Sequence, residues 1–288
     1  MPIKKVAPDE YQDPQIVNPL TKYYRVPGVY VRLPTDGAFM PPGSIDWTMN
    51  REVAVFPLRS ADEMLLKNPD ALMSGHAIES LLRSCVPAIR FPRLISSPDL
   101  DVLLIAMRAA TSGETLELDV TCPQCQKAMT THVSLGHMFT TIQTVDADNP
   151  VRLNDDIVVH MRPHNLANGT QLAMVSFEET RKVQAVENAE PEVRIKQVTA
   201  SMQRITDLSV EVLASCVVRV VVREGSITDQ SMILDFLRNV NKNWVTALQD
   251  KLDELNQRGI DKHYPVTCPA CQHAWQGEVE FNPSTFFA

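Results

Sequence analysis

The 288-residue sequence contains no stretch of 18 consecutive apolar residues, so we expect no membrane span. Its first residues, MPIKKVAPDEYQDP, lack the apolar central region of a secretory signal peptide. The expected compartment is therefore a reducing cytoplasm. No run of basic residues exceeds two, and 35 acidic side chains outnumber 27 basic ones to give a net charge of −8. This balance argues against a non-specific nucleic-acid binder, because phosphate neutralisation requires clustered Lys and Arg.

The sequence also lacks the common signatures of catalysis. It contains no GxxxxGK[ST], no GxGxxG after a strand, no HExxH and no GxSxG. His160 and His164 have a spacing that suits a metal on a helix, but the strand context and Pro163 favour an ordinary pair of histidines. Carboxylates are abundant, yet no spacing singles out an acid/base pair. We therefore predict that the chain is not an enzyme and has no catalytic residues.

One Cys-x-x-Cys phrase occurs twice in the chain. The stretch VTCPQCQKAMTTHVSL begins at Val120, and VTCPACQHAWQGEVEF begins at Val266. Eight of the sixteen aligned positions are identical, and 142 residues separate Cys125 from Cys268. Alternating apolar and polar residues surround each pair, which predicts a strand, a tight turn and a second strand. Each copy is therefore expected to present two thiolates from the turn of a small hairpin, here called a knuckle.

Two knuckles supply four sulfurs, the number that a closed tetrahedral zinc site requires. We interpret Cys122, Cys125, Cys268 and Cys271 as ligands of one structural zinc ion per chain. A thioredoxin-like redox motif is one alternative, although it needs a CxxC at a helix N-terminus and strands are expected here. A ribbon that has lost its metal is another. Four thiolates leave no open position for water, so a catalytic zinc is not expected.

Other residues near the knuckles have simpler interpretations. His132, His263 and His273 could replace a cysteine or contact a sulfur, but ordinary surface histidines are favoured. Cys85 and Cys216 lie in the similar stretches SLLRSCV and VLASCVV, each upstream of one knuckle. These stretches indicate either an ancient duplication of two halves or two buried core cysteines with chance similarity.

The chain divides into three predicted segments. Residues 1–50 hold eight of the 20 prolines with interleaved tyrosines, which predicts an extended arm with one strand at 29–33. The arm either grips a neighbouring subunit or packs on its own domain. Residues 51–140 form a first half with the first knuckle, and residues 141–288 form a second, helical half with the second knuckle and an aromatic tail. The best hinge is at 136–150.

Periodicity and capping residues predict a mostly helical α+β fold with the two halves joined by a zinc ribbon built from both CxxC knuckles. Ser60 resembles an N-cap with Glu63 as its capping-box partner, and Ser97-Pro98-Asp99 resembles a helix start that ends at Gly113. A hairpin is expected at 151–161, turning at Asn154-Asp155. Expected helices span 60–67, 76–84, 97–112, 165–186, 191–204, a segment from 207, 229–239 and 241–258, and expected strands span 52–58 and 217–222. The tail FNPSTFFA, with Phe281, Phe286 and Phe287, either plugs its own core or docks into a partner.

Several longer stretches resemble a known family. EVAVFPLRSADEMLLKNPDALMSGHAIESLLRSCVPAI, SSPDLDVLLIAMRAATSG and VTCPQC are similar to the baseplate hub subunit or hub assembly proteins of T-even-like contractile-tailed bacteriophages. RPHNLANGTQLAMVSFEETRKVQAVE, ITDQSMILDFLRNV, LNQRGIDK and EFNPSTFFA resemble the same family, so the resemblance runs from about residue 24 to the end. It implies the same four cysteines as zinc ligands and no catalytic residue.

The resemblance implies a non-enzymatic component of the phage tail baseplate hub that acts through protein–protein contacts. Its expected partners are other tail and hub proteins, including the tape-measure protein, and oligomerisation is open. A transient assembly chaperone for the hub or tape-measure protein, absent from the mature virion, is the nearest alternative. A zinc-ribbon nucleic-acid-binding protein is a third. The expected location is the host cytoplasm during assembly, with the virion tail baseplate as a further site.

Overall fold

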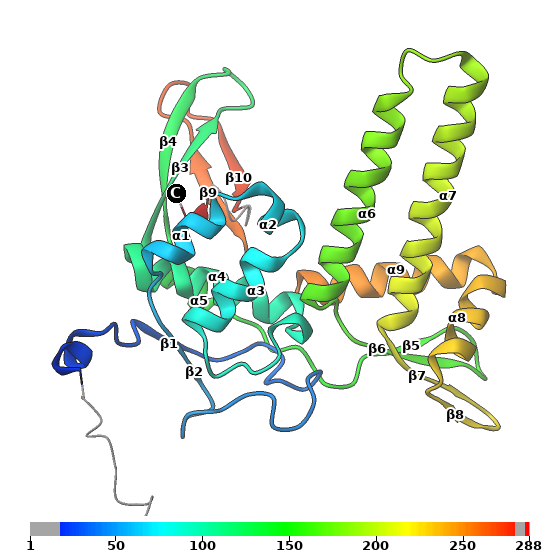
Figure 1. Cartoon of the computed structure of the whole chain (residues 1–288), viewed down its shortest axis with the longest axis horizontal. Helices are drawn as coiled ribbons and strands as arrows, with labels where there is room; N and C mark the ends of the chain where they lie inside the picture. The colour runs from blue at the N-terminus through cyan, green and yellow to red at the C-terminus, as the bar shows by residue number, and fades with distance from the viewer. Residues whose placement is uncertain (1–17, 280–285, 288) are drawn as a thin grey trace, which may run out of the picture.

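The computed structural model describes residues 18–279 and 286–287, and the chain folds as an α+β protein. Figure 1 shows two bodies joined by a long helix, with a two-helix hairpin projecting away from both. Buried apolar side chains form two clusters that correspond to these bodies. The division of the chain at 50 and 140 stays a prediction, while side-chain packing groups the described residues as set out below.

The first cluster is built around one buried helix. α4 (Ser97–Ser112) carries nine buried residues, because neighbouring elements cover it. The strand pair of β1 and β2 packs on it, and it also contacts α5 and α9 (Lys242–Gln257). The remaining elements of this body are β1 (Val29–Val31), β2 (Val53–Val55), α1 (Ser60–Leu66), α2 (Pro69–Met73), α3 (His76–Cys85), η3 (Pro92–Leu94) and α5 (Leu135–Thr140).

Two helix starts differ from the expected ones by one residue. α1 has Arg59 as its N-cap, because the buried carboxylate of Asp62 accepts the Arg59 backbone N–H at 2.9 Å whereas Glu63 is exposed. α4 has Ser96 as its N-cap, with Pro98 in its first turn and Gly113 at its C-cap, as expected. Two short helices were not expected, since α2 is only 5 residues long and α5 occupies the beginning of the predicted hinge.

The predicted arm is only partly an arm. Residues 31–45 supply Val31, Leu33, Met40 and Ile45 to the first cluster, and β1 lies within the strand expected at 29–33. This stretch therefore packs on its own domain. The preceding residues begin with η2 (Pro19–Tyr23), which lies on the outside of the body, and lead into β1 (Figure 1).

A buried carboxylate ties this stretch to α4. Asp99 is 0% exposed and accepts hydrogen bonds from the Thr35 backbone N–H at 2.9 Å, the Thr35 hydroxyl at 2.5 Å and the Ser96 hydroxyl at 2.8 Å. Burial raises the pKa of Asp99, and the hydrogen bonds from Thr35 and Ser96 only partly oppose this shift. The folded protein therefore holds this carboxyl in its neutral form more readily than the unfolded chain does.

This pKa shift predicts how Asp99→Asn changes the pH dependence of stability. A carboxyl whose pKa is raised on folding contributes stability below its unfolded pKa and loses that contribution as the pH rises through its folded pKa. Wild type should therefore gain stability relative to Asp99→Asn as the pH falls from about 7 towards about 4, the ordinary pKa of an aspartic acid. Urea unfolding of both proteins across this range measures the difference. A constant difference would contradict the assignment.

The second cluster lies between a four-stranded sheet and two helices. The sheet has the antiparallel order β5-β6-β7-β8. It confirms the predicted hairpin, in which the Asn154 side chain accepts the backbone N–H groups of Asp156 and Ile157. It also confirms a strand at 217–222, but this strand is only partly buried, since Val217 and Val220 are buried whereas Val218 is 40% exposed. The elements are β5 (Pro150–Arg152), β6 (Val158–Met161), β7 (Val217–Val222), β8 (Gly225–Ile227), α8 (Gln230–Asn239) and α9 (Lys242–Gln257).

The projecting hairpin consists of α6 (Leu166–Ala185) and α7 (Pro191–Ser215). The predicted break at Pro191 is confirmed. The predicted interruption between 204 and 207 is wrong, because α7 runs without a break for 25 residues. The sequence there contains no Pro or Gly, and Leu208 and Val212 are buried at helical spacing just beyond it.

The chain returns from the second cluster to the first at its end. Ile260, Tyr264, Val266 and Val279 belong to the first cluster. The outgoing and returning backbones touch, with the Gln143 N–H donating to the Gly259 carbonyl at 2.6 Å and the Asp261 N–H to the Thr141 hydroxyl at 3.0 Å. Gly259 has φ +112°, and a Cβ there would lie 3.0 Å from the Pro98 Cβ.

Phe286, near the end of the chain, packs into the first cluster. Phe286 is buried there, and its ring meets the ring of Phe287 edge-on with centroids 5.3 Å apart. This packing agrees with the expectation that the aromatic tail fills its own core, whereas Phe281 lies outside the described residues. Among residues 18–279 and 286–287, no helix has the length and apolar character needed to cross a membrane.

Candidate metal centre

Two β-hairpins that are far apart in the sequence lie side by side at the top of the first body (Figure 1). The first consists of β3 (Thr115–Thr121) and β4 (Ala128–Ser134), and the second of β9 (His263–Thr267) and β10 (Ala274–Glu278). Both are antiparallel, and the last paired residues are Thr121 with Ala128 and Thr267 with Ala274. Each turn between these pairs contains one CxxC motif.

The two turns have the same backbone geometry. In each, the N–H of the first cysteine donates to the carbonyl five residues on, at 3.0 Å in the first turn and 2.8 Å in the second. The residue after the second cysteine donates back to the first cysteine's carbonyl at 2.9 Å in both. That residue is Gln126 or Gln272, each with φ 58°. The identical letters VTCP-CQ thus correspond to identical local structure.

The four sulfurs converge on one point. Cys122, Cys125, Cys268 and Cys271 offer Sγ atoms that all lie within 4.8 Å of one another. The contacts between hairpins are 3.7 Å from Cys122 to Cys271 and 3.6 Å from Cys125 to Cys268. Four sulfurs each about 2.3 Å from a tetrahedral zinc ion would be about 3.8 Å apart. The donor set therefore fits a tetrahedral metal ion, and these distances are too long for disulfides.

Local hydrogen bonds favour ionisation of one sulfur. The backbone N–H groups of Cys271 and Ala270 donate to the Cys268 sulfur and lower the pKa of this thiol to about 6. The His273 backbone N–H acts in the same direction on Cys271, but burial and the neighbouring thiols outweigh it and raise the pKa of Cys271 to about 12. The knuckle thus stabilises a thiolate at Cys268, which is the form that binds a metal.

The cluster is open on one side. Cys122 and Cys268 are buried, whereas Cys271 is half-buried and Cys125 is exposed. The first cysteine of each knuckle therefore faces the protein and the second faces outward. Within the part of the chain that the structure describes, these four residues are the only group of three or more side chains that could hold a metal ion.

The nearby histidines do not enter this cluster. His132 lies 3.8 Å from Glu117 across β3 and β4, His263 pairs with Asp261 at 3.0 Å, and the His273 ring stacks on Trp275. The structure thus agrees with the interpretation of all three as ordinary surface residues.

The surroundings of the CxxC motifs also bear on the redox alternative. Each motif lies in a turn between two strands, so no helix N-terminus adjoins either pair. The helix dipole that activates a thioredoxin-like thiol is therefore missing from both sites.

Cys85 and Cys216 occupy equivalent places in the two clusters. Cys85 ends α3 and Cys216 is the C-cap of α7, and both are 0% exposed. Burial raises the pKa of the Cys85 thiol and raises that of Cys216 to about 11. Both are therefore unreactive core residues at neutral pH, and their equivalent positions are compatible with either origin of the similar stretches.

His160 and His164 do not form a site. His160, in β6, has its Nδ1 atom 2.5 Å from Oδ1 of Asp148, which precedes β5. His164 joins the two bodies, since its carbonyl accepts the Ser97 N–H at 2.8 Å and its N–H donates to Asn256 at 2.8 Å. Burial lowers the pKa of His164, which favours the neutral imidazole.

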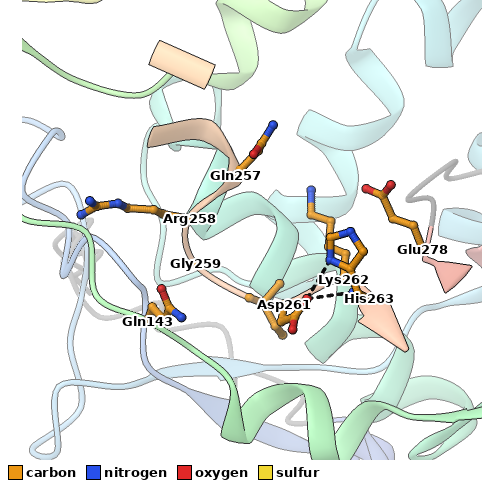
Figure 2. Close-up of a pocket in the computed structure, with 9 residues that line it drawn as sticks. Gln143, Gln257, Arg258, Gly259, Asp261, Lys262, His263 and Glu278 are labelled. Atoms are coloured by element: carbon orange, nitrogen blue, oxygen red, sulfur yellow. Dashed lines mark hydrogen bonds and ion pairs between the residues drawn. The ribbon is translucent and has the colours of Figure 1, made fainter. Parts of the chain in front are cut away.

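A polar pocket of about 390 Å³ lies where the chain returns from α9 to β9 (Figure 2). Its cationic side chains have acidic partners. Figure 2 shows His263 bonded to Asp261, while Lys262 binds Asp101 at 2.5 Å and Arg258 binds Glu254. These pairs satisfy the cations of the pocket within the chain, so the pocket is part of the crossing between the bodies.

A comparison with known protein families found one match in the same part of the chain. The model of the family described as T4 bacteriophage base plate protein matches residues 53–288, which include both knuckles. No curated protein and no solved structure matched. Because the match covers well over half of the 288 residues, the chain belongs to the T4 bacteriophage base plate protein family.

Proposed function

We propose that this chain is a non-enzymatic structural subunit of the hub of a contractile phage baseplate, stabilised by one zinc ion at Cys122, Cys125, Cys268 and Cys271. Membership of the base plate family supports a structural protein that contacts other baseplate proteins. The observation that carries the proposal is the exposed apolar segment at the N-terminal side of β1, because it offers a surface for a partner.

The zinc ion would act as a clip and not as a reaction centre. Four thiolates fill a tetrahedral shell and leave no position for water or substrate. The zinc ion would join the β3–β4 hairpin to the β9–β10 hairpin, which are separated by more than 140 residues of chain. The residues of the second cluster lie in this intervening chain, so the metal would hold together the two segments that flank them.

The exposed segment presents five large apolar side chains within 11 residues. The exposed fractions are 59% for Leu20, 73% for Tyr23, 60% for Tyr24, 70% for Val26 and 55% for Tyr30. Tyrosine is enriched at protein–protein interfaces, where its ring supplies apolar area and its hydroxyl a hydrogen bond. A cluster of this kind next to a packed core indicates a docking surface.

One arginine holds this segment against the body. The Arg25 guanidinium donates to the Pro57 carbonyl and to the Ser84 carbonyl, each at 2.5 Å, and to the Ser84 hydroxyl at 3.0 Å. Asp62 lies 3.9 Å from the same guanidinium and compensates its charge. The clamp orients the segment, so its apolar side chains face outward in a defined direction.

The double substitution Tyr24→Ser and Val26→Ser should reduce incorporation of the subunit into phage tails by about tenfold or more, because central aromatic contacts carry most of the energy of an interface. Tails purified from phage that carry the variant can be assayed with an antibody against this chain. Met49→Ser is the matched control, since Met49 is also fully exposed but lies outside the segment. Equal incorporation of all three proteins would contradict the proposed surface.

The same tails distinguish a resident subunit from a transient assembly protein. A resident hub subunit should be present at a constant number of copies per purified tail. Absence from mature tails, together with a complex in infected cells, would replace the proposal with the assembly-chaperone function. The presence of the subunit in the mature virion is thus tested by one quantitative measurement.

A further inference from the structure

The α6–α7 hairpin has almost no apolar core of its own in its outer part. Figure 1 shows it projecting beyond both bodies. Its register is set by the Ser201 hydroxyl, which donates to Glu179 at 2.7 Å. Between residues 173 and 206, Glu179 and Ser201 are the only buried residues, and both are polar. Helices in water gain most of their stability from packing an apolar face, and within the described chain this part of the hairpin has little to pack on besides its own two helices and α2.

One side of the hairpin carries an uncharged seam. Its positions on α6 are spaced 3, 4 and 3 residues apart, and those on α7 are spaced 4, 3, 4 and 3 apart, which is the spacing of coiled-coil core positions. All are exposed or half-exposed, with Ile195 and Met202 each 65% exposed. The seam comprises Ala173, Ser176, Thr180 and Val183 of α6 and Ile195, Thr199, Met202, Thr206 and Ser209 of α7.

Both halves of the seam line one groove. A groove of about 520 Å³ near the tip is lined by Val183 from α6 and by Ile195 and Thr199 from α7. The charged residues Arg181 and Lys182 line a different groove with Met174 and Phe177. The charges of the shaft are therefore separated from the seam.

The seam can be dehydrated at low cost. The hydroxyls of Thr180, Thr206 and Ser209 donate to carbonyls of their own helices at 2.7, 2.9 and 2.8 Å. A hydroxyl that already has an intrahelical partner leaves no unpaired donor when a second surface covers it. The seam thus behaves as an apolar surface although several of its residues are polar.

We propose that the seam is the contact surface for a second copy of this chain, and that two hairpins form a four-helix bundle about a two-fold axis parallel to the hairpin. Such an axis places α6 of each copy against α7 of the other at the same height. A two-fold contact requires a self-complementary surface, and the charges support it. The two charged residues that line the groove at the tip are Glu187 and Arg194, which follow α6 and begin α7 respectively. The axis brings each of them against the opposite charge in the other copy.

The size of the seam indicates a reversible dimer. Residues 173–187 correspond to a length of about 21 Å, and two helices are about 20 Å wide. Their product is about 420 Å² per copy, or about 840 Å² for the two copies, which lies in the range of weak, transient interfaces, so a dissociation constant in the micromolar range is expected.

Sedimentation of the purified, metal-replete full-length chain over roughly 1–100 μM tests the proposal. Wild type should pass from monomer to dimer over this range. Met202→Lys places a charge in the seam and should raise the dissociation constant by about tenfold or more. Gln203→Lys, which adds the same charge one position along and can keep the contact with Asp207, should change it by less than about threefold.

A charge exchange tests the symmetry of the contact. Glu187→Arg and Arg194→Glu should each weaken the dimer, because each creates two like-charge contacts. The double exchange should restore it. Circular dichroism of every variant reports whether the hairpin remains folded. A monomer at all concentrations, or a dimer that Met202→Lys leaves unchanged, would overturn the proposal. The measurement uses this chain alone, so its outcome is independent of the proposed role in the hub.

Discussion

Replacing Cys122 and Cys268 together by serine should abolish zinc binding and unfold at least the first body. The double variant removes one buried sulfur from each knuckle, so neither hairpin retains a pair of thiolates. Structural zinc contributes on the order of 10 kcal/mol in small zinc domains, which is comparable to the whole stability of an ordinary domain. Native mass spectrometry for zinc and circular dichroism for folding measure the two consequences.

Cys216→Ala is the matched control for this experiment. It removes a buried thiol that lies outside the metal cluster, in the second hydrophobic cluster. We expect it to retain one zinc ion per chain and to lose only the modest stability of a small core truncation. A wild-type protein without metal, together with a stable double variant, would overturn the zinc proposal and favour a ribbon that holds no metal.

Leu103→Ala should lower the free energy of unfolding by about 2–5 kcal/mol and should accelerate the loss of zinc to a chelator. Leu103 is 0% exposed on α4 and belongs to the same cluster as Val133 of β4 and Val266 of β9. Opening of this cluster is expected to separate the two hairpins. A loss of 2 kcal/mol would therefore speed zinc release about 30-fold, and a chromogenic chelator follows the rate.

Leu248→Ala provides the comparison within the second cluster. Leu248 is also 0% exposed, on α9, and its truncation should cost a similar free energy of unfolding. Because the second cluster does not contain the hairpins, zinc release should stay close to the wild-type rate. Equal acceleration by both substitutions would show that the two clusters open as one unit.

Local features of the metal centre could be predicted from the sequence. The alternation of apolar and polar residues around each CxxC pair is a pattern of residues close together in the chain. The residues that are identical in the two knuckles are close together in the same way. Backbone hydrogen bonds such as that from Cys122 to Lys127 are equally local. The strands, the turns and the candidate ligands were therefore accessible from the sequence.

Helices with clear periods and caps were also accessible, and the exceptions have identifiable causes. The cap of α1 lies at Arg59 because Asp62 also accepts the hydroxyl of Ser84, 22 residues away, at 2.7 Å. The short α2 and α5 have too few residues for a periodic signal. α7 is continuous because no Pro or Gly interrupts it between 204 and 207.

The α+β class, the two knuckles and most helices were predictable from the sequence, because they depend on residues close together in the chain. The folded structure was needed to show which sulfurs meet, that 260–279 returns to the first cluster, and that Phe286 fills this core. It also leaves the seam of α6 and α7 exposed. These outcomes depend on contacts between segments many residues apart, whose free energies come from burial and not from local backbone preference.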